Sequence, residues 1–452
     1  MAEDSVALAF QAYYQGKIEE ARELCERLLH AEPAHAPALM LLGLIAKKRN
    51  RFEDAASLLE RSVQIESNPL ALTSLADCLW RIGRLDEGLR YIEEAITRQP
   101  DSPEAQLVGA MLLHGLRRFD AALERVRCAQ TLLPESHLVE ARLGCISTQL
   151  GRYEDAERHF RNVARLMPKF GHCRAINFGQ EMWREIEPRS GASAAEELEP
   201  LREASIRQPY AAVVAAFCDV RYFYKYGVTF VNSFAQNAAR DKLLHLHILD
   251  PEPGFAAYLD HLIARVRLQN VVVTVERAPL ADATHNNSRK TFYSCARFIH
   301  MGWLLQYYKT TIACFDIDTV FETPIDAMIA SVKGGDVGLI QREPPDSPWL
   351  DIIANIVIAN QTEPAQRYFA AVRNFIRHFA GRGELFWHLD QIALYCVLKM
   401  MERFSAPPRV DWITQRARAA VFHIGNPYDF RLQDARVARY QLADLAAKAE
   451  PS

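Results

Sequence analysis

The sequence predicts a chain of two domains: an all-α superhelix built from repeated helix pairs, followed by an α/β domain. Three observations lead to this fold class. The chain has 452 residues, more than the roughly 250–300 that one hydrophobic core usually holds. Small residues recur every 33 or 34 positions through its first third. From Ala211 onward, short β-rich runs alternate with amphipathic stretches of helical length.

The bulk composition is that of a globular protein, with 49% hydrophobic and 24% charged residues. The net charge of −3 gives no reason to expect a nucleic-acid or anionic-membrane partner. No run approaches the ~18 apolar residues of a membrane span, and Glu3 and Asp4 stand where a signal peptide would carry basic residues. The nine cysteines are scattered, without a C-x-x-C pair. We therefore expect reduced thiols and a cytoplasmic protein.

Five repeats share one register at four positions. Each has a small residue as its reference point, and these are Ala21, Ala55, Gly88, Ala122 and Ala156. Three residues earlier stands a large apolar residue, namely Ile18, Phe52, Leu85, Phe119 and Tyr153. Twelve residues earlier stands a second small residue, namely Ala9, Gly43, Ala76, Ala110 and Gly144. Twelve residues later stands a proline in all repeats but one, in the series Pro33, Ser67, Pro100, Pro134 and Pro168.

This register predicts a helix-turn-helix unit. Small residues permit two helices to cross closely, and a proline ends the second helix. The turn positions hold Gly16, Asn50, Gly83, Arg117 and Gly151. The pattern resembles the tetratricopeptide family over residues 3–168. The resemblance implies a right-handed superhelix whose concave face binds a peptide or protein; a spacer or oligomerisation module is the alternative. Over residues 169–205 we expect a capping helix around Trp183 and then a linker beginning at Pro188.

The second domain is expected over residues 206–445. Its predicted strands are Ala211–Cys218, Leu243–Leu249, Val271–Val275, Thr311–Phe315, Val337–Ile340 and Ile353–Ala359. Its predicted helices include Arg221–Ala239, Phe255–Val266 and Lys290–Tyr308. This alternation favours a mainly parallel sheet, in which ligands bind at the carboxyl ends of the strands.

A D-x-D motif follows the fourth predicted strand, in the run Cys314-Phe-Asp316-Ile-Asp318-Thr319. Two carboxylates spaced in this way can approach one hard divalent cation. Such an ion, Mn²⁺ or Mg²⁺, bridges to a diphosphate and neutralises the charge of the leaving group. Two solvated loop acids are the alternative interpretation.

Further motifs follow the same order along the chain: Cys218-Asp219-Val-Arg-Tyr222, the Arg297 helix before the D-x-D, Asp390-Gln391 and Phe422-His423-Ile-Gly425. Together they resemble the GT-A nucleotide-sugar transferases, and among these family 8, over roughly residues 211–430. The resemblance implies a Rossmann-like GT-A domain and a glycosyltransferase that uses a nucleotide-sugar donor, most simply a UDP-sugar.

The resemblance also implies roles for individual residues. Asp219 and Tyr222 contact the nucleoside base, and Arg297 contacts the phosphates or the sugar of the donor. Asp316 contacts the ribose and the metal. Asp318 and His423 complete the metal ligands, and Asp390 faces the donor sugar or the acceptor.

The chain departs from the family in its late motif. The family has a phosphate-binding lysine there, whereas Ile-Gly-Asn-Pro-Tyr428 follows His423 without one, and Arg431 is the substitute candidate. Donor identity and stereochemistry therefore stay open: Asp390 acts as the base if transfer inverts the anomeric centre, and positions the donor if transfer retains it.

Two other functions fit parts of the sequence. The chain could be a tetratricopeptide adaptor with a non-catalytic transferase domain. It could also be a haloacid-dehalogenase-like phosphatase with Asp316 as nucleophile, although Gly335-Asp336 lacks the later aspartate of that family. His245 and His247 point to one face of a strand and are interpreted as sheet histidines, and Trp387 is interpreted as a packing residue.

Overall fold

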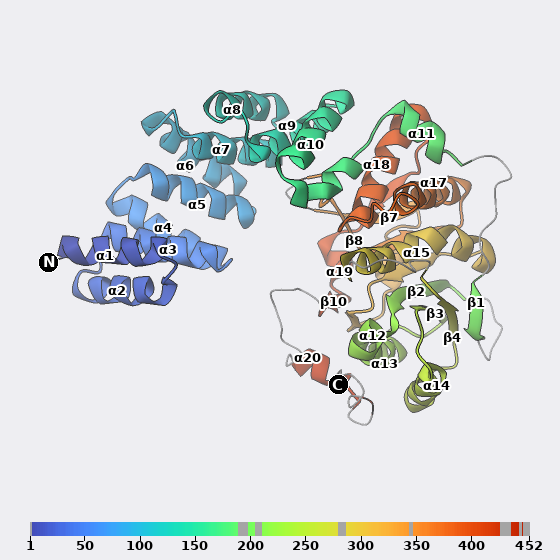
Figure 1. Cartoon of the computed structure of the whole chain (residues 1–452). Coiled ribbons are helices and arrows are strands. Elements are labelled where there is room, and N and C mark those ends of the chain that lie inside the picture. The colour runs from blue at the N-terminus through green and yellow to red at the C-terminus, as the bar shows by residue number, and fades with distance from the viewer. Residues whose placement is uncertain are drawn as a thin grey trace. The chain divides into compact units, whose positions relative to one another are not determined.

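The computed structural model describes residues 2–188, 198–203, 210–278, 286–342, 347–424, 435–442 and 445. The chain divides into two compact units, one comprising Met1–Arg174 and Glu343–Ser347, the other Ala175–Arg342 and Pro348–Ser452 (Figure 1). None of the helices in the described part of the chain combines the length and apolarity that a bilayer span requires.

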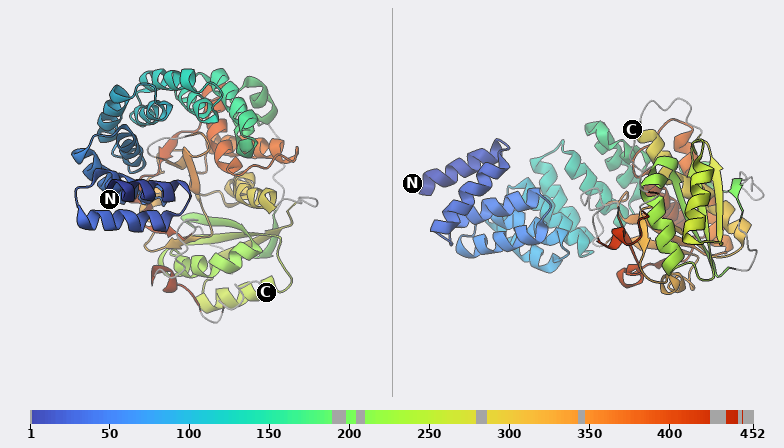
Figure 2. Two further views of the ribbon diagram at one scale, coloured as in Figure 1. Left: turned by 60° about the vertical axis from the view of Figure 1, so that its left-hand side comes forward. Right: turned by 90° about the horizontal axis from the view of Figure 1, so that it is seen from below.

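The first unit consists of consecutive helix pairs that follow one another in an arc (Figure 2). The pairs are α1 (Ala2–Tyr14) with α2 (Ile18–Ala31), α3 (Ala36–Lys48) with α4 (Phe52–Ile65), α5 (Pro69–Arg81) with α6 (Leu85–Arg98), α7 (Pro103–Gly115) with α8 (Phe119–Leu132), and α9 (His137–Gln149) with α10 (Tyr153–Leu166). The second helix of every pair ends two residues before the position of the repeat proline. The all-α prediction for the first domain is confirmed.

The turn inside each pair has a left-handed backbone at one residue. The φ angles are +79° at Gly16, +58° at Asn50, +80° at Gly83, +61° at Arg117 and +70° at Gly151. Glycine adopts this conformation without the steric penalty of a Cβ atom, whereas arginine does not. Arg117 therefore occupies a backbone position that suits glycine.

Close helix crossings explain the small residues of the register. A Cβ atom on Gly43 would lie 2.6 Å from Cγ of Leu59, and one on Gly144 would lie 2.7 Å from Cε1 of Phe160. Neither distance is compatible with van der Waals packing. Glycine at these positions lets the two helices of a pair approach each other.

The second unit is built on a mixed sheet of eight strands in the order β1-β4-β3-β2-β5-β8-β7-β9. The strands are β1 (Glu199–Arg202), β2 (Ala212–Asp219), β3 (Lys242–Leu249), β4 (Val271–Glu276), β5 (Ile312–Phe315), β7 (Val337–Gln341), β8 (Ile352–Ala359) and β9 (Val410–Trp412). Strands β4, β3, β2 and β5 are parallel neighbours. A separate two-stranded antiparallel sheet pairs β6 (Thr319–Phe321) with β10 (Val421–His423).

Helices cover both faces of the main sheet (Figure 1). Side chains alternate between the faces along each strand. In β2, Val214 and Ala216 belong to the core cluster that includes residues of α13 (Val228–Asn237) and α14 (Phe255–Val266). The opposite face, which includes Phe217, lies against α15 (Asn286–Tyr308). Helices α17 (Glu363–Ala380) and α18 (Leu389–Phe404) pack beside α15 on that face. The prediction of an α/β domain is confirmed, whereas the finer GT-A fold stays a prediction.

Two details differ from the sequence prediction. The predicted parallel centre is present, but β1 and β8 extend it with antiparallel pairs, so the sheet is mixed. The predicted helix Arg221–Ala239 is divided into α12 (Val220–Tyr222), a π-helical turn (Phe223–Gly227) and α13. Close packing accounts for Gly227 in this turn, since a Cβ atom there would lie 2.7 Å from the Phe223 ring.

Residues Ala175–Ile186 belong to the second unit. They include α11 (Gln180–Ile186), which packs against α17 and α18. The Asn374 side chain donates to the Ile186 carbonyl over 2.9 Å, and the Arg403 guanidinium donates to the Phe178 carbonyl over 2.6 Å. Trp183 is buried in α11. Its expected role as a cap of the repeats stays a prediction. The expected linker beyond Pro188 lies mainly outside the described residues, but Glu199–Arg202 within it form β1 and pair with β4, so this part is a strand of the main sheet and not a linker.

Candidate active site

Four parallel strands of the sheet end in acidic residues at the same edge. Asp316 follows β5, Asp219 ends β2, Asp250 follows β3, and Glu276 ends β4. Because the carboxyl ends of parallel strands meet at one edge, these acids form a row across neighbouring strands. Asp219 and Asp316 were predicted as site residues from the sequence, whereas Asp250 and Glu276 were not.

One face of α15 supplies the partners of three of these acids. Tyr293, Arg297 and His300 have the i, i+4, i+7 spacing that places side chains on one side of a helix. The Tyr293 hydroxyl donates to Oδ2 of Asp250 over 2.8 Å. Nε2 of His300 lies 2.8 Å from Oε2 of Glu276. Arg297 contacts Asp316, as described next.

The guanidinium of Arg297 connects two acids from different parts of the chain. It forms an ion pair with Asp316 and, through Nη2, a hydrogen bond of 3.0 Å to Oδ2 of Asp390 on α18. Arg297 and Asp390 are both buried. Burial alone would lower the pKa of Arg297, but the carboxylates of Asp316 and Asp390 raise it, so the guanidinium stays charged. Burial and the nearby Asp318 raise the pKa of Asp316 against the opposing effect of Arg297.

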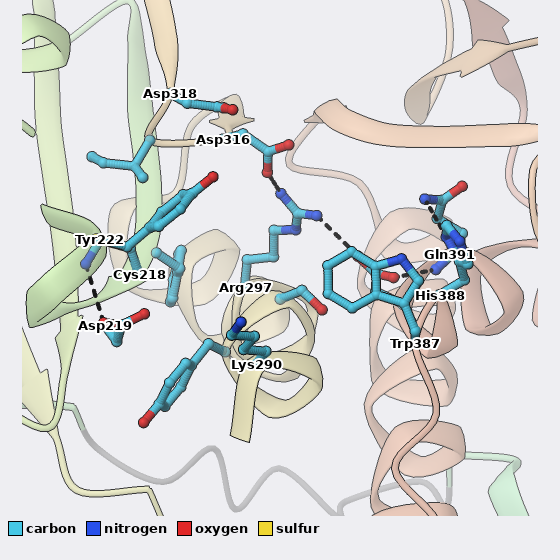
Figure 3. A pocket seen from close by; sticks show the side chains of 15 residues that line it. Cys218, Asp219, Tyr222, Lys290, Arg297, Asp316, Asp318, Trp387, His388 and Gln391 are labelled. Carbon is cyan, nitrogen blue, oxygen red and sulfur yellow. Dashed lines mark hydrogen bonds and ion pairs between the residues drawn. The ribbon is translucent and has the colours of Figure 1, made fainter. Parts of the chain in front are cut away.

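A cavity of about 410 Å³ opens above this edge of the sheet (Figure 3). Its lining residues come from β2 and α12, from α15, from the loop after β5, and from the start of α18. They are Phe217, Cys218, Asp219, Tyr222, Lys290, Tyr293, Ser294, Arg297, Asp316, Ile317, Asp318, Trp387, His388, Asp390 and Gln391. The structure thus brings six of the seven predicted site residues together in one cavity, namely Asp219, Tyr222, Arg297, Asp316, Asp318 and Asp390.

The seventh predicted site residue, the metal-ligand candidate His423, lies near the D-x-D because of the small sheet. Antiparallel pairing of β10 with β6 places His423 opposite Thr319, and its Nδ1 lies 3.0 Å from Oγ1 of Thr319. The same Nδ1 lies 3.9 Å from Oδ1 of Asp318. The backbone amide of Ile424 donates to the Asp318 carbonyl over 2.9 Å, which fixes the strand to the D-x-D loop.

The donor set around the D-x-D fits a divalent cation in chemistry. Two carboxylates and one imidazole are ligands that Mn²⁺ accepts. In the described residues, however, the three ligand atoms of Asp316, Asp318 and His423 do not all lie within 4.8 Å of one another. Asp316 is turned toward Arg297 instead. Binding of one ion by all three residues would therefore require some of these ligand atoms to move closer together.

Asp219 and Tyr222 stand at the other end of the cavity. Oδ1 of Asp219 accepts hydrogen bonds from the backbone amides of Arg221 at 2.9 Å and Tyr222 at 3.1 Å, so the carboxylate caps α12. Among the described residues, these two amides are the hydrogen-bond donors to the Asp219 carboxylate. Burial, together with the charge of Asp318, raises the pKa of Tyr222, and its hydroxyl stays protonated at neutral pH. Figure 3 shows the Tyr222 ring and the Trp387 indole on opposite sides of Arg297.

Trp387 lines the cavity, contrary to the prediction from the sequence. Its interpretation as a packing residue is wrong, because its surface is 58% exposed and it lines the cavity. The next residue, His388, has a φ of +71°, a left-handed conformation that is costly for a residue with a Cβ atom. Burial lowers the pKa of His388, so its imidazole is neutral at pH 7. No sequence pattern indicated this left-handed conformation at His388.

Two further points concern the sequence predictions. Gly425–Tyr428 and Arg431, the departures in the late motif, lie outside the described residues. Asp336, considered for the phosphatase interpretation, does not line the described cavity; its Oδ2 accepts from the Arg409 amide over 2.7 Å.

Comparisons with known proteins find repeat families within the first unit. The family described as "Tetratricopeptide repeat" matches residues 73–135, and the family described as "Anaphase-promoting complex, cyclosome, subunit 3" matches residues 14–95. Tetratricopeptide repeats are therefore present in the N-terminal region, as the sequence predicted. Such repeats are typical of protein-interaction modules. No curated protein matches the chain.

Solved structures similar to the chain include MamA 41-end from Desulfovibrio magneticus RS-1, at 18% identity and a TM-score of 0.34, covering 37% of this chain and 95% of that chain. Another is YrrB, a TPR protein with an unusual peptide-binding site, at 16% identity and a TM-score of 0.34, covering 37% of this chain and 87% of that chain.

Proposed function

We propose that the second unit is a metal-dependent glycosyltransferase that moves a sugar from a nucleoside-diphosphate donor, such as a UDP-sugar, to an acceptor. The observation that carries the proposal is the charge of the cavity at the carboxyl ends of β2 and β5. Four carboxylates line it, against two cationic side chains, Lys290 and Arg297. An anionic diphosphate enters such a cavity favourably only together with a cation.

The residues that would hold the ion are Asp318, His423 and Asp316. When bound there, Mn²⁺ or Mg²⁺ neutralises the charge that develops on the departing diphosphate. Arg297 contributes a fixed positive charge beside the same place, and because it is buried its electrostatic effect is weakly screened.

Asp390 suits a positioning role better than that of a base. Its Oδ2 accepts from Arg297 and its Oδ1 accepts from the backbone amide of Gln391 over 2.9 Å. A general base needs an oxygen within hydrogen-bond reach of the acceptor hydroxyl. With both oxygens engaged, Asp390 holds Arg297 and the donor sugar in place, which favours the retaining alternative.

Two aromatic side chains of the cavity, Tyr222 and Trp387, offer separate surfaces for the nucleotide and the sugar. Tyr222, 40% exposed, offers a ring for the base next to Asp219, whereas Trp387 offers an exposed indole on the other side of Arg297. Sugars and bases both stack on aromatic faces with a gain of roughly 1 kcal/mol or more. Base and sugar would therefore lie on opposite sides of the arginine.

The presence of the repeats favours a protein acceptor. Tetratricopeptide repeats bind peptides or proteins, and a recruited acceptor would reach a high effective concentration near the donor. Sugar transfer itself needs no such module. We propose that the first unit recruits the acceptor; the adaptor function without catalysis is the second candidate, since the repeats alone support it.

The test is calorimetric binding of UDP with Mn²⁺, without it, and after addition of EDTA. The proposal expects measurable affinity only with the ion, and no binding by the Asp318→Asn variant. A screen of nucleotide sugars would then show slow donor hydrolysis. Equal UDP affinity in all three conditions would falsify the metal role. Release of phosphate from an aryl phosphate, with no turnover of any nucleotide sugar, would establish the phosphatase alternative.

A further inference from the structure

A second group of potential metal ligands lies behind the cavity wall. His247 on β3, Glu276 at the end of β4 and His300 on α15 each present one ligand atom, and these atoms all lie within 4.8 Å of one another. Nε2 of His247 is 3.2 Å from Oε2 of Glu276, and Nε2 of His300 is 2.8 Å from the same oxygen. Among the described residues this is the one such group of three.

We infer that His247, Glu276 and His300 form a binding site for a divalent transition metal such as Zn²⁺, distinct from the D-x-D. Two imidazoles and one carboxylate are a recurrent zinc ligand set that leaves a fourth position for water. In a tetrahedral zinc site neighbouring ligand atoms are about 3.3 Å apart. The present separations of the Glu276 oxygen from the two imidazole nitrogens are already close to that value.

A second layer of hydrogen bonds fixes the orientation of His247. Its other ring nitrogen, Nδ1, lies 2.8 Å from Oγ1 of Thr274. The same hydroxyl lies 3.0 Å from Nε2 of His245, whose Nδ1 is 2.7 Å from the hydroxyl of Tyr308. Histidine ligands of metals usually have such a partner on the second ring nitrogen, which directs the first one at the ion.

Packing holds the imidazoles in these positions. The Phe217 ring lies parallel to the His300 ring, with 6° between the planes and 6.2 Å between the centroids, and it is 5.0 Å from the His247 ring. His247 is fully buried and His300 is 4% exposed. The ligands are thus ordered before any ion binds, which lowers the entropic cost of binding.

The location indicates what the ion would do. Phe217 lines the cavity of the candidate active site, but His247, Glu276 and His300 do not. The ion would instead tie β3 and β4 to α15, and His300 lies one helical turn beyond Arg297 on the same face. The site would hold α15, and with it Arg297, against the sheet.

The inference is tested on the full chain after dialysis against a chelator. Co²⁺ is added as a spectroscopic probe, and Zn²⁺ is then titrated in competition. We expect the visible absorption of four-coordinate cobalt at one equivalent, its displacement by Zn²⁺, and a melting temperature that rises with Zn²⁺ concentration. Glu276→Gln and His300→Gln should each weaken cobalt binding by at least about tenfold, since even loss of an outer hydrogen-bond partner costs about that much.

Two controls separate this site from the D-x-D and from a folding defect. Asp318→Asn should leave the cobalt spectrum unchanged. Thr274→Val keeps all three ligands but removes the partner of His247, so it should bind cobalt about ten- to a hundredfold more weakly than the wild type. If the wild type shows no cobalt absorption, or if Asp318→Asn abolishes the absorption while Glu276→Gln and Thr274→Val leave it intact, the inference is overturned.

Discussion

Arg297 and Asp390 are 93 residues apart in the chain, yet Nη2 of the arginine donates to Oδ2 of the aspartate over 3.0 Å in the interior of the second unit. The arginine comes from α15 and the aspartate from the first turn of α18. A buried charge without its partner is strongly destabilising, whereas removal of both charges is much less so. This relationship fixes the relative position of two helices that line the cavity.

The first prediction concerns this pair. Arg297→Met and Asp390→Asn should each lower the free energy of unfolding by roughly 3–5 kcal/mol. The double variant should lose less than the sum, with a coupling of about 1–3 kcal/mol. Urea unfolding of the four proteins measures it. Additive losses would mean that the hydrogen bond contributes nothing beyond the two separate residues.

The second prediction concerns Glu276 in the metal-free protein. Burial raises the pKa of this carboxyl, but hydrogen bonds from His247 and His300 outweigh the burial and lower it to about 2. In the unfolded chain the pKa is about 4.3. A carboxyl with a lowered folded-state pKa stabilises the fold fully above its unfolded pKa, and this stability is lost as pH falls toward the folded value.

The wild type should therefore be more stable than Glu276→Gln at pH 6. Between about pH 5 and pH 2 the difference should shrink, by up to about 3 kcal/mol, because the loss is complete only near the folded-state pKa. Denaturant unfolding at several pH values, with a chelator present, measures the difference. A difference that stays constant with pH, or grows as the solution becomes more acidic, would contradict the assignment.

The third prediction concerns Trp387, which is exposed on the cavity wall. Trp387→Ala should leave the melting temperature nearly unchanged, because little of the side chain is buried. It should reduce kcat/KM by about tenfold, corresponding to the loss of one stacking contact of roughly 1–1.5 kcal/mol. Trp387→Phe should keep part of the activity.

Trp412 provides the matched control for this experiment. It is 44% exposed in the same unit but does not line the cavity. Trp412→Ala should therefore leave kcat/KM at the wild-type value. If both alanine variants lose activity to the same extent, the effect does not come from stacking in the cavity.

The fourth prediction concerns the turns of the repeats. Arg117→Gly should raise the unfolding free energy by about 0.5–1 kcal/mol, because the φ of +61° strains a residue with a Cβ atom. Gly83→Ala should lower the unfolding free energy by a similar amount, because φ there is +80°. The added methyl group meets no atom within 4 Å, so the change tests backbone strain without a steric clash. Thermal melts compare the variants. A stabilised Gly83→Ala would show that unfolded-state entropy outweighs the strain.

The fifth prediction concerns the division between the units. A chain that begins at Ala175 keeps α11, which packs on α17 and α18, and should fold. It should bind UDP with Mn²⁺ as the full chain does, because every cavity residue lies in the second unit. It should lose most transfer to a protein acceptor at subsaturating concentration, while transfer to small sugar acceptors is kept. Equal transfer to the protein acceptor would argue against recruitment by the repeats.

The sequence alone determined the features that depend on local order. The helix pairs could be predicted from Gly43, Gly144 and their equivalents because each repeat packs mainly on its neighbours in the chain, so one period describes both sequence and structure. The bounds of β2, β3, β4, β5, β7 and β8 were predicted within one residue because burial on both faces requires continuous apolar runs, whereas the short strands β1, β6, β9 and β10 were not predicted. The position of the D-x-D after a strand follows from the same local pattern.

Only the tertiary structure decided which distant residues meet. Strand order and register depend on pairing between segments far apart in the sequence, and no local period encodes them. The parallel pairing of β3 with β4 places Glu276 beside His247, and the pairing of β10 with β6 brings His423 to the D-x-D loop. Whether Trp387 packs or faces a cavity depended likewise on where α18 begins against the sheet, because burial is a property of the assembled fold and not of the residue type.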